Sequence, residues 1–125
     1  MSNDAPTVLV VDDEACILSV LRRSLRREGW RVLTAGTPDE ALRILDEEPI
    51  DAVLSDHKMP RMSGLEVLEV AARRRPNAAR ILISGWPDEI PAERLAALGV
   101  HALIPKPWDD AELKRILREA FARRP

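Results

Sequence analysis

Residues 53–60 read Val53-Leu54-Ser55-Asp56-His57-Lys58-Met59-Pro60. A short apolar run typical of a buried strand ends at Asp56, and the following methionine-proline pair turns the chain away. Open α/β sheets bind their ligands at the carboxyl ends of their strands, which is where this carboxylate would lie. An aspartate there is also a common turn former or helix cap, so Asp56 becomes a site residue only if others converge on it.

The composition is that of a globular domain. The chain has 125 residues, of which 46% are hydrophobic and 32% charged, enough for one domain with a core. A net charge of -2 argues against direct nucleic-acid binding, and no apolar run is long enough to predict a membrane span. The N-terminus lacks the basic and apolar regions of a signal peptide. We expect one cytoplasmic domain over residues 1–125, with the single Cys16 as a small packing residue.

Strand and helix patterns alternate five times along the chain. Continuous apolar runs predict strands buried on both faces, and a less apolar run predicts a strand nearer the edge of the sheet. The expected strands are 8–11, 31–35 (the strand nearer the edge), 52–55, 81–83 and 101–104. Short connections through helices imply right-handed crossovers and a parallel sheet with helices on both faces.

The intervening helices have their own start signals and apolar faces. Residues 37–40 and 63–66 each combine an N-cap residue with a glutamate three positions on, which is a capping box. Pro91 opens a short fourth helix that ends near Gly99, and Asp109 caps the last helix. The residues predicted to face the core are Ile17, Leu18, Leu21, Leu25, Ala41, Ile44, Leu45, Leu65, Leu68, Ala72, Leu113, Ile116, Leu117, Ala120 and Phe121.

Polar residues stand where the predicted strands end. Asp12 and Asp13 follow the first strand, Asp56 the third, Ser84 the fourth and Lys106 the fifth. In a doubly wound sheet of order 2-1-3-4-5, the first and third strands are neighbours at the switch point. Carboxylates from distant parts of the chain would therefore meet in one crevice, and this convergence predicts a site.

Taken together, these motifs resemble the receiver domain of two-component response regulators over essentially the whole chain. An acidic pair, a lone aspartate, Ser-Gly and Lys-Pro are each weak motifs. Their order, and their positions at successive strand ends, make a specific pattern. The resemblance implies a flavodoxin-like α/β fold with five helices around a five-stranded parallel doubly wound sheet, in the order 2-1-3-4-5 known from flavodoxin and chemotaxis receivers.

The resemblance implies a phosphorylation chemistry. Asp56 would be the nucleophile that accepts a phosphoryl group, and Lys106 would pair with the phosphoryl oxygens. Asp12, Asp13, Asp56 and the backbone carbonyl of Lys58 would bind Mg²⁺ or Mn²⁺. Like charges ~5 Å apart repel by roughly 3 kcal/mol at an effective dielectric near 20, so such a cluster favours a cation. A solvated acidic patch without a metal is the alternative.

Ser84 would be the switch hydroxyl, which bonds the phosphoryl group and moves the loop and helix that follow. The alternative is a serine that caps the next turn. The family usually has Tyr or Phe three residues before the lysine, where this chain has Leu103. We therefore expect output to depend more on backbone movement over residues 84–98. Lys106-Pro107 resembles the cis peptide of the family.

Residues around the expected pocket have more modest interpretations. Glu14 is read as a residue favoured by the helix dipole, with a third acidic neighbour of the pair as the alternative. His57 is read as a solvent-facing loop residue. Lys58 and Trp86 would line the mouth of the pocket, where a bulky Trp86 would shield the acyl phosphate from water.

Among classes of function, a phosphorylation-controlled interaction module is favoured, with at most self-phosphorylation and self-dephosphorylation as activity. A haloacid-dehalogenase-like phosphatase would carry its Asp-x-Asp motif on the first strand, unlike Asp56-His57-Lys58 on the third. A flavodoxin-like cofactor binder would need a phosphate-binding loop after the first strand, where this chain is acidic.

The expected partners follow from the favoured class. They are a sensor histidine kinase or phosphotransfer protein and a downstream protein target or effector domain, without direct contact to nucleic acid or membrane. A phosphorylation-dependent dimer is a further hypothesis. The chain either acts alone or is cut from a larger regulator with a DNA-binding or cyclic-di-nucleotide phosphodiesterase domain. Residues 106–110, Lys-Pro-Trp-Asp-Asp, resemble receivers of the phosphodiesterase type.

Overall fold

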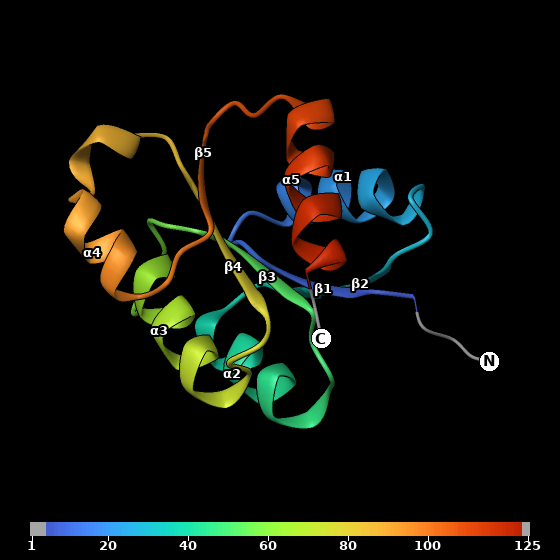
Figure 1. Ribbon diagram of the computed structural model, residues 1–125, viewed down its shortest axis with the longest axis horizontal. Helices are drawn as coiled ribbons and strands as arrows, with labels where there is room; N and C mark the ends of the chain where they lie inside the picture. The colour runs from blue at the N-terminus through green and yellow to red at the C-terminus, as the bar shows by residue number, and fades with distance from the viewer. Residues whose placement is uncertain (1–4, 124–125) are drawn as a thin grey trace.

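In the computed structural model, which describes residues 5–123, five parallel strands form one sheet with helices on both faces (Figure 1). The strands are β1 (Thr7–Val11), β2 (Arg31–Ala35), β3 (Ala52–Asp56), β4 (Ala79–Ser84) and β5 (Ala102–Pro105). Their order, β2-β1-β3-β4-β5, confirms the predicted topology and places the less apolar strand at an edge. The register sets Val11 beside Ser55 and Asp56 beside Ile83, which brings the strand ends level.

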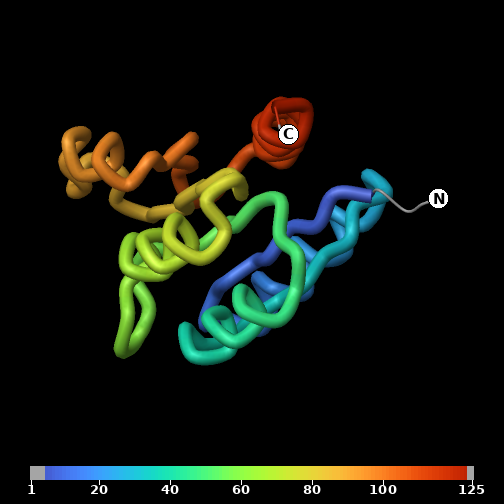
Figure 2. Tube along the Cα trace, turned by 60° about the horizontal axis from the view of Figure 1, so that its bottom comes forward, coloured from blue at the N-terminus to red at the C-terminus, as the bar shows by residue number. Residues whose placement is uncertain are grey.

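The helices are α1 (Ala15–Arg26), α2 (Pro38–Glu47), α3 (Gly64–Arg74), α4 (Ala92–Ala97) and α5 (Asp110–Ala122), with a 3₁₀ turn, η1 (Pro87–Glu89). One apolar layer packs α1 and α5 on the sheet, and the other packs α2 and α3 on its opposite face. Figures 1 and 2 show α4 beside α3 and β5, far from α1 and β2. Within residues 5–123, no helix is long and apolar enough to cross a bilayer.

The predicted caps form, with one change of partner. Ser63 and Glu66 make the full capping box, because each side chain accepts a hydrogen bond from the other's backbone N–H. Thr37 accepts from the N–H of Glu40, but the Glu40 carboxylate reaches past Thr37 to the N–H of Gly36 at 2.9 Å. These caps fix where α2 begins after β2 and where α3 begins after β3.

Several details differ from the sequence-based expectation. Cys16 is exposed on α1 and does not pack in the core. Pro91 is the N-cap residue of α4, and the preceding turn η1 was not predicted. Of the residues expected to face the core, five are only half-buried because they lie at the margins of their helical stripes: Ile17, Leu18, Ala72, Ile116 and Ala120.

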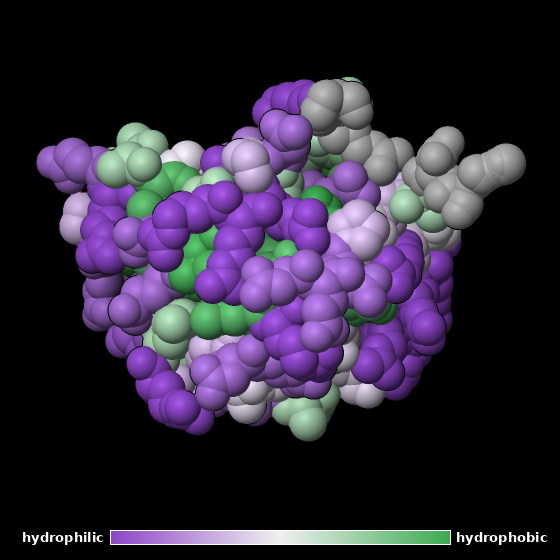
Figure 3. All heavy atoms as spheres, turned by 90° about the horizontal axis from the view of Figure 1, so that it is seen from below, coloured by the Kyte–Doolittle hydropathy of each residue, from purple (hydrophilic) through white to green (hydrophobic). Residues whose placement is uncertain are grey.

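The face over α2 and α3 is mostly hydrophilic, with small apolar areas between charged side chains (Figure 3).

Candidate functional site

The structure brings the predicted acidic residues together at the carboxyl edge of the sheet. Asp12 and Asp56 are buried, at 3% and 7% exposure, whereas Asp13 is exposed. Each of the three offers a carboxylate oxygen, and these oxygens all lie within 4.8 Å of one another. An all-oxygen cluster with two buried members is a donor set that suits a hard divalent cation.

Lys106 enters this cluster from the end of β5. Its Nζ lies 2.8 Å from Asp56 Oδ1, 3.5 Å from Asp12 Oδ2 and 4.0 Å from Glu14 Oε1. Burial works against the charged ammonium, but the bonds and charges of Asp56 and Asp12 outweigh it, and the pKa of Lys106 is raised. The Lys106-Pro107 peptide is cis, as the resemblance implied.

Asp12 is a carboxylate whose charged form is disfavoured by its surroundings. Burial raises the pKa of Asp12, and the negative charge of Asp56 adds to this, so that the pKa stays raised despite the bond from the Glu14 N–H and the charge of Lys106. The Glu14 N–H donates to Asp12 Oδ1 at 2.8 Å. A second cation beside Lys106 would relieve this carboxylate.

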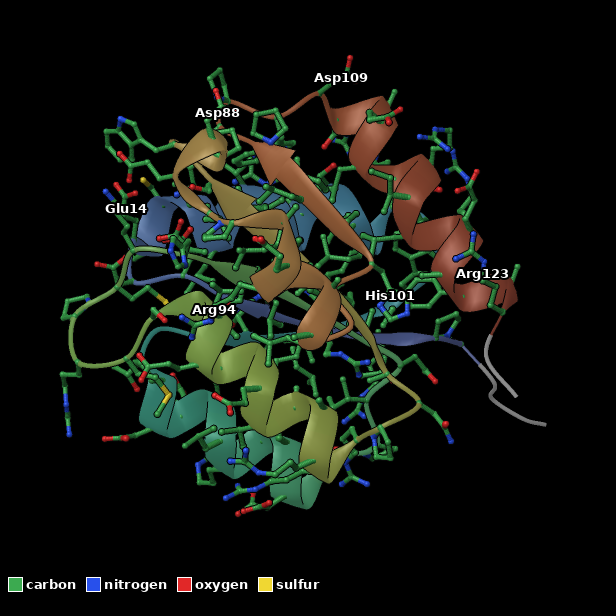
Figure 4. All side chains as sticks on the ribbon, turned by 60° about the vertical axis from the view of Figure 1, so that its left-hand side comes forward. Glu14, Asp88, Arg94, His101, Asp109 and Arg123 are labelled. Atoms are coloured by element: carbon green, nitrogen blue, oxygen red, sulfur yellow. The ribbon has the colours of Figure 1, made fainter. Side chains whose placement is uncertain are left out.

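Glu14 lies closer to the site than predicted. It is the N-cap residue of α1, without a side-chain capping bond, and its carboxylate lines the cavity beside Lys106. The alternative of a third acidic neighbour therefore fits the structure better than a residue placed only by the helix dipole. Figure 4 shows Glu14 and Asp88 at the carboxyl edge of the sheet, and His101 and Arg123 toward the opposite edge.

Backbone contacts hold the start of α3 close against the end of β3. Gly64 donates its N–H to the His57 carbonyl at 2.7 Å, and a Cβ on Gly64 would lie 2.1 Å from the Asp56 carbonyl oxygen. Ser55 Oγ donates to the same Asp56 oxygen at 2.9 Å. Sequence reasoning identified Gly64 only as part of a capping box. The sequence signal for this close approach of α3 to β3 is that a glycine directly follows the N-cap serine.

Ser84 is buried at the end of β4, at 1% exposure. Its hydroxyl accepts the Trp86 N–H at 3.0 Å, and its carbonyl accepts the Lys106 N–H at 2.9 Å. The turn-capping interpretation therefore describes a bond that is present. The bond also joins the predicted switch hydroxyl directly to the start of residues 85–98, the β4–α4 segment.

A cavity of about 350 Å³ opens above these groups. It is lined by Asp13, Glu14, Asp56, Lys58, Ser84, Gly85, Trp86 and Lys106. At its mouth the Lys58 Nζ lies 4.3 Å from the centre of the Trp86 ring and 3.3 Å from Glu89 Oε1. Both predicted rim residues therefore lie at the cavity, held together by a cation–π contact and an ion pair.

Two further predictions have mixed outcomes. His57 does not simply face solvent: its Nδ1 is buried without a hydrogen-bond partner among residues 5–123, and burial lowers the pKa of His57. Leu103 lies half-buried in β5 against the apolar layer that also contains Leu95 and Leu98. The Lys58 carbonyl as a metal ligand stays a prediction.

A buried acidic cluster with a lysine, at the carboxyl edge of a 2-1-3-4-5 sheet, defines a receiver domain. A family profile described as the response regulator receiver domain matches residues 8–118. The chain belongs to this family and is a receiver domain of two-component signalling.

Similar proteins agree with this assignment. The probable chemotaxis protein CheY of Rhizobium etli is 32% identical and covers 91% of both chains. The hydrogenase transcriptional regulatory protein HoxA of Cupriavidus necator is 40% identical over 96% of this chain, which spans only 25% of that regulator. A CheY-like receiver domain from Methanospirillum hungatei superposes with a TM-score of 0.87 at 30% identity over 95% of both chains. The signal receiver domain of an HD domain-containing protein from Pseudomonas fluorescens gives 0.88 at 31%, over 94% of this chain and 95% of its own.

Proposed function

We propose that Asp56 accepts a phosphoryl group from the phosphohistidine of a sensor histidine kinase or phosphotransfer protein. The observation that supports this most directly is the 2.8 Å contact of Lys106 Nζ with Asp56 Oδ1 inside a buried acidic cluster. A carboxylate oxygen of Asp56 would attack phosphorus while the bond from phosphorus to the histidine nitrogen breaks. The nitrogen leaves with the electron pair, and the product is an aspartyl phosphate.

The charges around Asp56 suit this transfer. Asp12, Asp13 and Asp56, with the Lys58 carbonyl, would hold Mg²⁺ or Mn²⁺, which supplies neutralisation of the phosphoryl oxygens when bound. Lys106, which contacts both Asp56 and Asp12, supplies a second positive charge. Three carboxylates, one divalent cation and one ammonium sum to zero, so an incoming anionic group meets a neutral site.

Ser84 would transmit the change. Its hydroxyl is bonded to the Trp86 N–H, so a move toward the phosphoryl oxygen gives up that bond and frees the start of the β4–α4 segment. Leu103 offers no aromatic ring to follow, so the backbone of residues 84–98 would carry the signal to the surface of α4 and β5. A downstream protein, an attached effector domain or a second phosphorylated copy would read that surface in the cytoplasm.

The chain spans about a quarter of the length of the larger regulators that it matches, HoxA among them. We therefore propose that, in a longer protein, this receiver would be joined to an effector domain, either a DNA-binding domain or a cyclic-di-nucleotide phosphodiesterase. The receiver itself would contribute no turnover beyond its own phosphorylation and dephosphorylation.

Intact-mass spectrometry after incubation with Mg²⁺ and acetyl phosphate tests the proposal. One added phosphoryl group is expected in the wild type and in Asp88→Asn, a control for an exposed aspartate in η1 at the same edge of the sheet. Asp56→Asn should show none. An adduct that persists in Asp56→Asn would contradict the assignment of the acceptor.

A further inference from the structure

Arg80 lies near the amino end of β4, away from the candidate site at the carboxyl ends of the strands. Its Nε donates to the carbonyl oxygens of Leu98 at 3.0 Å and Gly99 at 3.2 Å. Its Nη1 donates to the carbonyls of Ala78 at 3.1 Å and Pro76 at 3.5 Å. One guanidinium therefore joins the exit of α3 to the residues that end α4.

The end of α4 is shaped to receive this side chain. Gly99 has a φ of +63°, and a Cβ there would lie 2.7 Å from Arg80 Nη2. Carbonyls at a helix C-terminus lack intrahelical partners, and a cation there also complements the helix dipole. The helix has its own C-terminal bonds, from the Gly99 N–H to the Ala96 carbonyl at 3.0 Å and from the Val100 N–H to the Leu95 carbonyl at 2.9 Å. Arg80 adds to them from β4, because it bonds the Leu98 and Gly99 carbonyls.

Residues just after α4 are tied to Arg80 a second time. The Arg80 N–H donates to His101 Nδ1 at 3.0 Å, and the His101 N–H donates to the Arg80 carbonyl at 2.7 Å. His101 and Asp88, which lie on either side of α4 in sequence, are well separated in Figure 4. The two ends of the β4–α4 segment are therefore held at different places by different groups.

The other end of the segment is held less directionally. Ile90, the buried residue before α4, makes apolar contacts, which are non-directional. The ion pair of Glu89 with Lys58 is exposed, at 59% and 57% of the two side chains, and exposed pairs hold weakly. The directional bond at this end, from the Trp86 N–H to the Ser84 hydroxyl, is the one that the proposed switch would break, whereas the bonds of Arg80 at the other end do not involve the candidate site.

We propose that Arg80 is the pivot of α4: it pins the C-terminal end of the helix so that the segment opens from its N-terminal end, beside Ser84. The part of this proposal that concerns signalling rests on the proposed function, because Ser84 is the group that would start the movement. The pinning itself is a property of the unphosphorylated protein and is measurable there.

Amide hydrogen exchange on the unphosphorylated protein, with Arg80→Gln beside the wild type, tests the pin. In the wild type, amides of residues 86–93 should exchange at least about tenfold faster than those of residues 95–101, which include the Val100 N–H bonded to the Leu95 carbonyl. Loss of the charged donor should speed exchange over residues 95–101 by about tenfold or more and remove the difference. Arg80→Lys keeps the charge without the planar fork and should recover only part of it.

Arg75→Gln is the matched control. Arg75 bonds carbonyls at the end of α2 in the same way, with Nε 2.8 Å from the Leu45 oxygen, so its loss should speed exchange at that end and leave α4 unchanged. An unaltered difference across α4 in Arg80→Gln, or faster exchange spread evenly over the whole protein, would overturn the pivot. No phosphodonor is used, so failure of Asp56 phosphorylation would show in the mass experiment and not here.

Discussion

Lys106 Nζ lies 2.8 Å from Asp56 Oδ1, a contact that joins the end of β5 to the end of β3 across β4. The ammonium lies in a cluster where three carboxylates would otherwise repel one another. Lys106 therefore has two tasks: it stabilises the metal-free site, and it is positioned beside the proposed acceptor.

Lys106→Met should destabilise the metal-free protein at neutral pH by about 1–3 kcal/mol, because Asp12 and Asp56 lose their shared cation. Mg²⁺ should restore much of this loss, since it supplies charge to the same carboxylates. Urea unfolding with and without Mg²⁺ measures both effects. Lys114→Met is the control: this lysine is similarly covered but pairs with Glu28 and Asp110, so Mg²⁺ should not rescue it. Equal rescue of both variants would contradict the role of Lys106.

Asp12→Asn should have the opposite effect on metal-free stability. The pKa of Asp12 is raised in the folded protein, chiefly by burial, so the folded state binds more protons than the unfolded chain just above the ordinary value of 3.8. The free energy of unfolding therefore falls as pH rises through that window. The asparagine variant should show a weaker fall and exceed the wild type at pH 7 by more than about 0.5 kcal/mol. Asp12→Asn should also lose stabilisation by Mg²⁺; unchanged pH dependence would refute the argument.

Gly64→Ala should destabilise the protein, because residue 64 lies against the end of β3. The added Cβ would lie 2.1 Å from the Asp56 carbonyl oxygen and 2.8 Å from Leu82 Cδ1, and neither the backbone oxygen nor the packed leucine can yield easily. We expect a loss of about 3 kcal/mol in the free energy of unfolding, at the upper end for overpacking. Gly85→Ala, where a Cβ meets nothing within 4 Å, should change it little. Thermal unfolding of both variants is the measurement, and similar stabilities would contradict the close approach.

The positions of Asp12, Asp13, Asp56, Ser84 and Lys106 were predictable because they depend on periodicity and on where strands end, whereas the sheet order came from the resemblance to receiver domains. Parallel strands bring their carboxyl ends to one edge, so residues at those ends meet whatever their separation in sequence. The acidic cluster was therefore predictable once the resemblance had supplied the strand order.

What the sequence did not reveal depends on side-chain reach and direction. The Glu40 carboxylate bonds the Gly36 N–H and not that of Thr37, because neighbouring N–H groups compete for it. Glu14 turns toward Lys106, which is distant in sequence and is brought near by the fold. Arg80 reaches the end of α4 through long-range packing that no local motif signals. Cys16 is exposed because it lies outside the narrow apolar stripe of α1.

Ser84→Ala should still be phosphorylated but should not pass the change on to residues 86–93. The variant keeps Asp12, Asp56 and Lys106, so acetyl phosphate should still add a phosphoryl group. It lacks the hydroxyl that now accepts the Trp86 N–H and would later bond the phosphoryl oxygen. Exchange over residues 86–93 should therefore be faster than in the wild type at rest and should change little on phosphorylation. Ser84→Thr retains the hydroxyl and should behave as the wild type; a full response in the alanine variant would remove Ser84 from the switch.

Trp86→Ala should shorten the life of the aspartyl phosphate. The indole lines the cavity that contains Asp56 and is covered on one side by the Lys58 ammonium, 4.3 Å from the ring centre. Although 58% of Trp86 is exposed, its removal would widen the path of water to the phosphoryl group and free Lys58 from the ring. Dephosphorylation after removal of the phosphodonor, followed by intact mass, should be several-fold faster. Trp86→Phe keeps an aromatic face for Lys58 and should lie between the two, whereas an unchanged rate in Trp86→Ala would show that the indole does not shield the site.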